Sequence, residues 1–382
     1  MHHFHYRGGA LHCEDVDLAE IANAVGTPVY VYSTATLRRH AQVIAGVFEG
    51  LECLIAYSVK ANGNLGVLAT LAAEGCGADV VSAGELQRAL VAGIPAGKIV
   101  FSGVGKTREE MRFALQQGIH QFNVESAAEL EVLSEIAVDT GAVAPIALRV
   151  NPDVAAGGHP NISTGKQGDK FGVPWGEAEA LYQRAADLPG VDPVGVDVHI
   201  GSQIGDLEPM EAAFRKTVGL VDRLREAGHA ISRIDLGGGL GIPYAEGDAP
   251  APPDAYARMI RRVIGDSPVE IILEPGRVIA GNAGVMITKA LYQKPAPDRT
   301  FLIVDAGMND LMRPALYAAH HDILPLKKPA DAEATQTVDV VGPICESTDK
   351  FATGRDLPPI GSDDLIAFLS AGAYGAVLSS QY

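Results

Sequence analysis

The sequence has 382 residues, of which 47% are hydrophobic and 20% charged, with 43 glycines and 23 prolines. That composition is typical of a globular protein rather than of a disordered or fibrous chain. The formal net charge of −17 argues against nucleic acid or an anionic membrane as a partner. No apolar run approaches the roughly 18 residues of a membrane-spanning helix, and residues 1–7 lack the apolar core of a signal peptide.

From the N-terminus, residues 18–22 indicate a short helix and residues 27–32 a strand. Apolar strand-like runs then alternate with amphipathic helical patterns. The strand-like runs end at Tyr57, Ser82, Ser102, Val124, Val150, Ile200, Leu236 and Leu273. The helical patterns span residues 65–74, 84–91, 108–117, 127–138, 177–186, 209–227 and 255–263. Eight such repeats within about 230 residues predict an α/β fold, a (β/α)8 barrel of the TIM type.

The alternation of strand and helix patterns ends after Gly281. Strand patterns at residues 285–292, 300–305, 337–341 and 365–369 are joined by Pro- and Gly-rich links with little helix. They predict a C-terminal all-β domain, a sandwich or barrel. We expect a barrel domain at residues 31–281, and a second domain formed by residues 1–30 and 282–382.

Polar groups follow seven of the eight predicted strands almost at once. They are Lys60, Glu85, Glu125, Asn151, His199, the glycines 237–239 and Glu274. A barrel gathers the C-terminal ends of its strands on one rim, whereas an open doubly wound sheet, the alternative, spreads them along an edge. The concentration of polar groups at strand ends therefore favours the barrel.

Lys60 ends the first of these strands. A lysine that is half desolvated at the mouth of a strand is a candidate nucleophile toward a carbonyl group. A lysine at a strand end can also simply extend its amine to water. The stretch alone leaves both interpretations open.

Other motifs do not complete a site. Residues 103–107 resemble the end of a phosphate-binding P-loop, but the pattern needs glycine where Val100 stands. Residues 237–241 resemble a dinucleotide fingerprint, but Ile242 replaces its last glycine. The run 320–322, His-His-Asp, predicts a surface pair, because adjacent residues on a helix point apart.

The four cysteines, Cys13, Cys53, Cys76 and Cys345, are scattered. They show neither a CxxC pair nor the Cys/His spacing of a metal site. We therefore expect no bound metal, and a reducing cytoplasm as the location.

Several motifs occur together in a family-like order. They are Tyr-Ser-Val-Lys-Ala-Asn at 57–62, His-Ile-Gly-Ser-Gln at 199–203, Asp-Leu-Gly-Gly-Gly at 235–239, Glu-Pro-Gly-Arg at 274–277, Cys-Glu-Ser-Thr-Asp at 345–349 and Gly-Ala-Tyr-Gly at 372–375. In these motifs the chain resembles the fold-type III pyridoxal-phosphate decarboxylases, and most closely their diaminopimelate decarboxylase branch. The resemblance extends over nearly the whole chain.

The resemblance implies pyridoxal 5′-phosphate as the cofactor. It implies that Lys60 forms the Schiff base, that His199 stacks on the ring, and that Glu274 keeps the pyridine nitrogen protonated. Related alanine racemases place an arginine at that nitrogen, so Glu274 argues for decarboxylation. Phosphate-binding and neighbouring cofactor-binding positions implied by the resemblance are Ser202, Gly237, Gly238, Gly239, Pro275, Gly276, Arg277 and Tyr374.

The resemblance further implies a reaction: decarboxylation of meso-2,6-diaminopimelate to L-lysine and CO2, the last step of lysine biosynthesis. Its implied substrate-binding residues are Arg277, Arg313, Tyr317, Glu346 and Tyr374. Cys345 would return a proton to the substrate from the neighbouring subunit of a homodimer with shared active sites. Two alternatives stay open, a decarboxylase of arginine, ornithine or a carboxylated polyamine, and a catalytically silent homologue that binds a protein.

Overall fold

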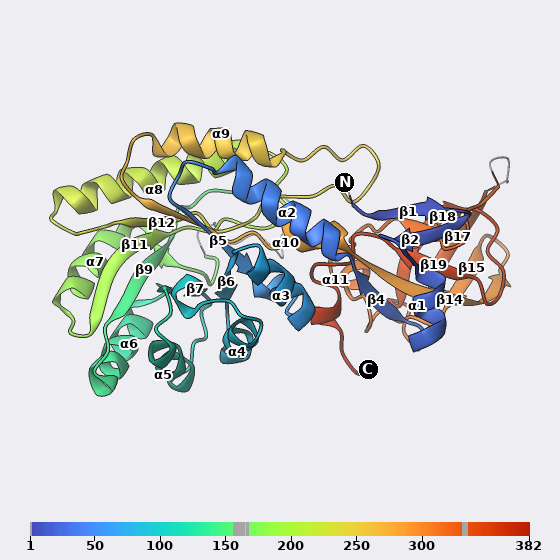
Figure 1. Cartoon of the computed structure of the whole chain (residues 1–382), viewed down its shortest axis with the longest axis horizontal. Helices are drawn as coiled ribbons and strands as arrows, with labels where there is room; N and C mark the ends of the chain where they lie inside the picture. The colour runs from blue at the N-terminus through green and yellow to red at the C-terminus, as the bar shows by residue number, and fades with distance from the viewer. Residues whose placement is uncertain (1, 156–164, 166–167, 331–334) are drawn as a thin grey trace. The chain divides into compact units, whose positions relative to one another are not determined.

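The computed structural model describes residues 2–155, 165, 168–330 and 335–382 (Figure 1). The chain forms two compact units, which are described separately. One contains residues 40–241 and 249–276, and the other contains residues 1–39, 242–248 and 277–382. The domain boundaries predicted from the sequence stay a prediction. Within the described residues, no helix has the length and apolar character needed to cross a membrane.

The first unit is built around a closed barrel of parallel strands, which confirms the predicted fold. In chain order these are β5 (Cys53–Ser58), β6 (Gly77–Val80), β7 (Ile99–Phe101), β8 (Gln121–Val124), β9 (Ala144–Asn151), β11 (Val191–Asp197), β12 (Arg233–Asp235) and β13 (Glu270–Leu273). Each strand pairs with the next, and β13 returns to β5 with Ile271 opposite Cys53, which closes the ring. The short strand β10 (Val173–Pro174) pairs with β9.

Helices follow most of the barrel strands, close to where the sequence predicts them. They are α3 (Leu65–Ala73), α4 (Ala83–Val91), α5 (Arg108–Gln117), α6 (Ala127–Thr140), α7 (Ala178–Asp187), α8 (Glu208–Glu226) and α9 (Pro253–Ile264). Side chains cap the starts of several of these helices: Ser82 accepts the amide of Glu85 on α4, Ser126 accepts that of Glu129 on α6, and Thr107 forms a capping box with Glu110 on α5. Helix α2 (Thr34–Val47) was not predicted.

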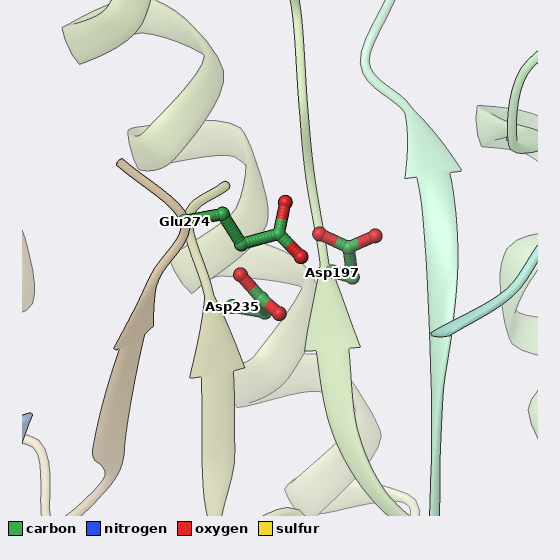
Figure 2. A group of neighbouring side chains, drawn as sticks. All are labelled: Asp197, Asp235 and Glu274. Carbon is green, nitrogen blue, oxygen red and sulfur yellow. The ribbon is translucent and has the colours of Figure 1, made fainter. Parts of the chain in front are cut away.

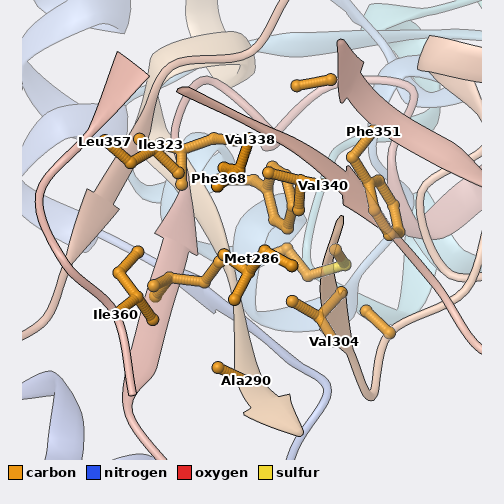
Figure 3. Packing of buried hydrophobic residues seen from close by; sticks show 14 of the residues in the cluster. Met286, Ala290, Val304, Ile323, Val338, Val340, Phe351, Leu357, Ile360 and Phe368 are labelled. Atoms are coloured by element: carbon orange, nitrogen blue, oxygen red, sulfur yellow. The ribbon is translucent and has the colours of Figure 1, made fainter. Parts of the chain in front are cut away.

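The second unit is mostly sheet. Its longest strand, β14 (Gly284–Pro295), pairs with β4 (Val29–Tyr32), β15 (Thr300–Val304) and β19 (Leu365–Phe368). Strands β16 (Ile323–Pro325), β17 (Gln336–Val341) and β18 (Lys350–Leu357) complete the sheet, and a separate small sheet contains β1 (Phe4–Arg7), β2 (Ala10–Cys13) and β3 (Val16–Asp17). Figure 3 shows the apolar core on this sheet, where Met286, Val338 and Phe368 are buried.

Candidate active site

The strand ends of the barrel lie on one rim, and Lys60 stands there on a single turn, η1 (Val59–Ala61), directly after β5. Its amine forms an ion pair with the fully buried Asp79 of β6. Asp79 also accepts a hydrogen bond from the Ser58 hydroxyl at 2.6 Å, and its second carboxylate oxygen has no hydrogen-bond partner among the described residues. Lys60 is therefore held at the rim by a partner that occupies one of its three amine hydrogens.

Three more buried acids gather beside this rim (Figure 2): Asp197 at the end of β11, Asp235 at the end of β12 and Glu274 just after β13. One carboxylate oxygen of each lies within 4.8 Å of the others. Burial, together with Asp79, raises the pKa of Glu274 to about 7. Burial and the Glu274 charge also raise the pKa values of Asp197 and Asp235 well above the usual range. Burial and mutual repulsion thus disfavour the negative charges of these carboxyl groups, so the cluster favours an added cation.

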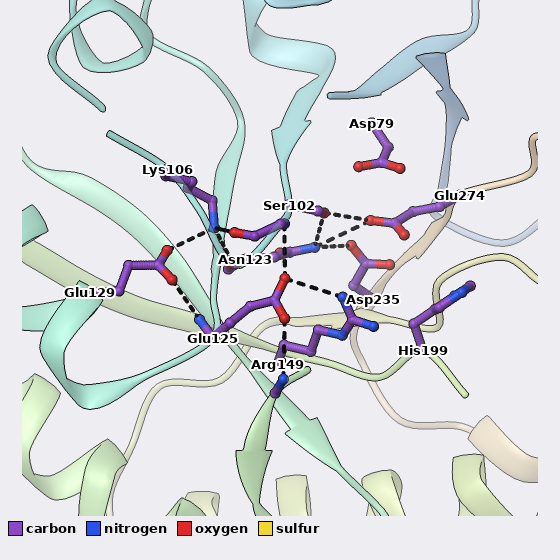
Figure 4. A network of polar contacts seen from close by, with 12 residues as sticks. Asp79, Ser102, Lys106, Asn123, Glu125, Glu129, Arg149, His199, Asp235 and Glu274 are labelled. Carbon is purple, nitrogen blue, oxygen red and sulfur yellow. Dashed lines mark hydrogen bonds and ion pairs between the residues drawn. The ribbon is translucent and has the colours of Figure 1, made fainter. Parts of the chain in front are cut away.

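Neutral side chains fix Glu274 in place (Figure 4). Its Oε1 accepts hydrogen bonds from the Ser102 hydroxyl at 3.1 Å and from the Asn123 amide at 3.3 Å. The same Asn123 amide donates to Asp235 at 3.0 Å. Ser102 follows β7 and Asn123 lies on β8, so two neighbouring strands orient one carboxylate without neutralising its charge.

Ion pairs lie farther along the rim (Figure 4). The buried Arg149 of β9 pairs with Glu125 at 3.2 Å, and the buried Lys106 pairs with Glu129 at 2.7 Å. Glu125 also accepts the backbone amides of Gly103 and Gly172. These contacts satisfy both charges of each pair, so they brace the loops of the rim.

His199, which follows β11, is held as a neutral ring. Its Nδ1 accepts the amide hydrogen of Gly238 at 3.2 Å, so the proton resides on Nε2. Burial, with the charges of Arg149 and Lys60, lowers the pKa of His199 well below its ordinary value. A neutral, oriented imidazole offers a flat face on which an aromatic ring can stack.

The glycine segment after β12 leaves no room for side chains. A Cβ on Gly238 would lie 2.3 Å from the Glu274 carbonyl oxygen, and one on Gly239 would lie 2.6 Å from that of Gly201. The Gly237 amide donates to Asp235, and the Gly238 amide to His199. Among the described residues no such bond forms from Gly239, so its amide is the one of the three that remains for an anion.

The second unit contains its own cluster of predicted site residues. Arg277 opens the short helix α10 (Arg277–Ala280) and lies 4.9 Å from the Tyr374 ring centre. Its guanidinium donates to the Tyr244 hydroxyl at 2.5 Å. Arg313 opens α11 (Arg313–Tyr317), is 5% exposed, and stacks 4.5 Å from the same Tyr244 ring. Two buried guanidinium groups around one tyrosine form a cluster suited to a carboxylate.

Cys345 and Glu346 lie on the exposed loop between β17 and β18. The buried Asp349 holds this loop, since its carboxylate accepts the amides of Ile344 at 2.6 Å and Met308 at 2.7 Å. Glu346 accepts from the Tyr382 hydroxyl. Within the described part of the chain, neither Cys345 nor Glu346 bonds to the arginine cluster.

The chain is similar to known proteins over most of its length. The family described as "Pyridoxal-dependent decarboxylase, pyridoxal binding domain" matches residues 34–281. The chain belongs to the pyridoxal-dependent decarboxylases. A protein of Pseudomonas fluorescens named diaminopimelate decarboxylase is 50% identical over 100% of this chain and 91% of its own. Another of that name, from Aquifex aeolicus, is 45% identical over 99% and 89%.

Solved structures of decarboxylases have the same fold as this chain. The Helicobacter pylori diaminopimelate decarboxylase complexed with L-lysine is 41% identical, covers 96% of this chain and 91% of its own, and has a TM-score of 0.92. The corresponding M. jannaschii enzyme in complex with L-lysine is 37% identical, with coverage of 99% and 90% and a TM-score of 0.93. The arginine decarboxylase of a Paramecium bursaria Chlorella virus, at 22% identity, shares the fold.

The residues present fit the cofactor of these decarboxylases. Pyridoxal phosphate carries an aldehyde, an anionic phosphate and a pyridine nitrogen that can be cationic. The barrel offers a lysine amine, a glycine segment without room for a Cβ, and a group of buried acids with raised pKa values. Each chemical feature of the decarboxylase cofactor thus has a complementary group.

Sequence reasoning missed several residues of the barrel rim, and one residue of the arginine cluster in the second unit. Asp79, Asp197, Ser102 and Asn123 belong to strands or strand ends, and Tyr244 to a loop. A usable signal for the acids was present: an aspartate near the end of an otherwise apolar strand faces either the core or the rim, and it needs a partner in both places.

Proposed function

We propose that this chain decarboxylates meso-2,6-diaminopimelate to L-lysine and CO2, with pyridoxal phosphate as cofactor. The observation that carries the substrate assignment is the pair of buried arginines, Arg277 and Arg313, arranged around Tyr244. Relatives at 44–50% identity over nearly the whole chain have the name diaminopimelate decarboxylase, which supports the same assignment.

The Lys60 amine binds the cofactor covalently, at the aldehyde carbon of the cofactor. Its place beside Asp79, on a turn whose flanking residues are buried, supports this role because a fixed amine needs little reorganisation to react. Glu274 holds a proton at the pyridine nitrogen, for which its own raised pKa and its contacts to Ser102 and Asn123 suit it. The bound cofactor supplies a sink for the electron pair left when CO2 departs.

Other rim residues orient the cofactor. His199 presents its neutral ring to the pyridine face, while the amides of Gly239 and Gly276 and the Tyr374 hydroxyl bind the phosphate. A Cβ would lie 2.6 Å from a carbonyl oxygen at Gly239 and 3.0 Å from two side-chain carbons at Gly276, which supports a close backbone approach there. Ser202, Gly237, Gly238, Pro275 and Arg277 are further members of this proposed cofactor site.

Arg277, Arg313, Tyr317 and Tyr374 bind the carboxylate at the end of the substrate that does not react, and Glu346 binds the amine there. Ornithine has no carboxylate at that end, so two arginines would face an amine and repel it. Diaminopimelate has both groups at that centre. The arginine pair therefore favours diaminopimelate over substrates that end in an amine alone.

Cys345 returns the proton to the substrate carbon from the neighbouring subunit of a homodimer. Its exposure on a loop supports a role toward a second subunit, because such a thiol is accessible there. All four cysteines are free, which supports a reducing compartment, and we propose the cytoplasm.

The test compares substrates and variants. Purified protein with pyridoxal phosphate is supplied in turn with meso-diaminopimelate, ornithine and arginine, and the released CO2 and the amine products are measured. We expect diaminopimelate to give L-lysine with the highest kcat/KM. Lys60→Ala should lose both turnover and the absorbance of the covalently attached cofactor. The control Lys98→Ala, which removes an exposed lysine, should keep both. Faster turnover of ornithine or arginine would refute the substrate assignment.

A further inference from the structure

His321 belongs to a His-His-Asp run that the sequence suggested was a surface pair. The structure separates the two histidines: His320 is exposed and bonds to Asp322 at 2.8 Å, whereas His321 is 1% exposed. One ring nitrogen of His321 lies 2.7 Å from the Leu369 carbonyl oxygen, and the other lies 2.9 Å from a terminal nitrogen of Arg313.

These two contacts define the tautomer of His321. The Leu369 carbonyl can only accept a hydrogen bond, so Nδ1 of His321 carries the hydrogen. The Arg313 guanidinium can only donate, so Nε2 of His321 must be the acceptor. Burial, followed by the Arg313 charge, lowers the pKa of His321 to about 3, in agreement with a neutral ring. Protonation of Nε2 would place a hydrogen against the hydrogens of Arg313.

Tyr244 fixes both groups from the side. Its ring lies 4.5 Å from the Arg313 guanidinium carbon and meets the His321 ring edge to face, with centroids 5.7 Å apart. A cation over an aromatic face is stabilised without losing its charge. Arg313 therefore has two oriented neighbours, and neither of them is an anion.

The charge of Arg313 remains available for a ligand. No acidic side chain among the described residues forms an ion pair with it, and its Nε, although buried, has no hydrogen-bond partner there. A carboxylate at the position of His321 would pair with Arg313 and compete with any anionic ligand. A neutral acceptor instead uses one N–H and leaves the positive charge.

We propose that His321 is a positioning residue for substrate specificity: as a neutral acceptor it fixes Arg313 for the carboxylate at the non-reacting end of the substrate. This inference rests on the proposed function, because it deepens the account of how that substrate is selected. Without His321, Arg313 keeps its charge but loses the contact that sets the direction of its remaining N–H groups.

Two ligands that differ by one carboxylate test the proposal. L-Lysine has the carboxylate, and cadaverine is the same molecule without it. Binding of each to the holoenzyme is measured by calorimetry for the wild type, His321→Phe, His321→Gln and the control His320→Phe. His321→Phe keeps the ring shape but removes both nitrogens, while His321→Gln keeps an acceptor. The control makes the same change at the adjacent exposed histidine.

We expect His321→Phe to weaken L-lysine binding about tenfold or more, as the loss of a hydrogen bond to a charged group predicts, and to change cadaverine binding less than about twofold. His321→Gln should lie between His321→Phe and the wild type, and His320→Phe should match the wild type. Unchanged absorbance of the bound cofactor serves as the check that each variant is folded.

Unaltered L-lysine binding in a folded His321→Phe protein would overturn the proposal, as would equal weakening of both ligands. The proposed function is judged separately by turnover of diaminopimelate in the wild type. A wild type without that turnover, but with carboxylate binding that depends on His321, would refute the function and leave the positioning role. Normal turnover together with unaltered binding in His321→Phe would refute only the positioning role.

Discussion

Replacing Glu274 by Gln should stabilise the cofactor-free protein while weakening its hold on the cofactor. Glu274 lies in the buried group with Asp197 and Asp235, and burial with the charge of Asp79 raises its pKa to about 7. A glutamine retains an oxygen that can accept from Ser102 and Asn123, yet it has no charge. The substitution therefore removes the repulsion between Glu274 and the neighbouring acids, and it keeps a side chain of nearly the same size in place.

The size of the effect follows from the pKa. The rise of the Glu274 pKa from 4.5 to about 7 corresponds to about 3 kcal/mol, since a shift of one pKa unit corresponds to about 1.4 kcal/mol. Two charges about 5 Å apart at an effective dielectric constant of about 20 repel by a similar amount. Because Glu274 binds its proton more tightly when folded, wild-type stability falls as the pH rises from about 4.5 to about 7.

Thermal unfolding of the cofactor-free proteins, followed by circular dichroism at pH 5 and pH 8, measures this difference. At pH 8 the Glu274→Gln midpoint should exceed that of the wild type by several degrees, about 2–4 °C for each kcal/mol in a unit of this size. At pH 5 the two should nearly coincide. Glu131→Gln, which removes one charge of a surface ion pair on α6, should change the midpoint by a smaller amount that is the same at both pH values. A midpoint difference that is absent at pH 8, or that is the same at both pH values, would refute the electrostatic argument.

Arg149→Met leaves Glu125 buried without its partner and should cost about 3–5 kcal/mol in urea unfolding, whereas Arg184→Met, at an exposed pair with Glu131, should cost less than about 1 kcal/mol. Tyr244→Phe removes the acceptor for Arg277 and should weaken L-lysine binding to the holoenzyme about tenfold with the cofactor absorbance unchanged; equal binding would contradict a role for that hydroxyl. Asp349→Asn removes an acceptor of the loop that carries Cys345 and should lower turnover about tenfold at constant cofactor content. Unchanged turnover would contradict a role of this loop in catalysis.

The barrel was predictable because its signals are local. Each strand is a short apolar run, and each helix has its own cap or periodicity, as at Ser82, Thr107 and Ser126. The predicted end at Ile200 lies beyond the last residue of β11, Asp197, since the apolar pattern continues past the strand, where the Val198 amide still donates to the Asp235 carbonyl. Helix α2 was not predicted because it lies between the strand pattern at residues 27–32 and the first strand of the barrel, outside the strand–helix repeats on which the assignment was based.

The site was predictable only in part. Residues with a reactive group in a recognisable motif, such as Lys60 and Glu274, were proposed from the sequence, and the structure places them at the barrel rim and in its group of buried acids. Asn123 could not, since a single amide within a strand has no pattern, and its importance comes from bonds to residues more than 100 positions away. The prediction for His321 was wrong because it assumed a helical surface run. The run is not helical, and only His320 of the pair is exposed.

Apart from the Lys60–Asp79 pair, the buried charges named above have two kinds of partner, and the kind of partner distinguishes structural pairs from candidate binding groups. Lys106 with Glu129, and Arg149 with Glu125, are matched by opposite charges, so each pair is satisfied without a ligand. Glu274 is held by neutral donors, and Arg313 by a neutral histidine and a tyrosine ring. Keeping such a charge buried costs free energy, which an ion of opposite sign can recover. The same criterion supports the proposal that the acids of the barrel bind a cationic ring and that the arginines of the second unit bind a carboxylate.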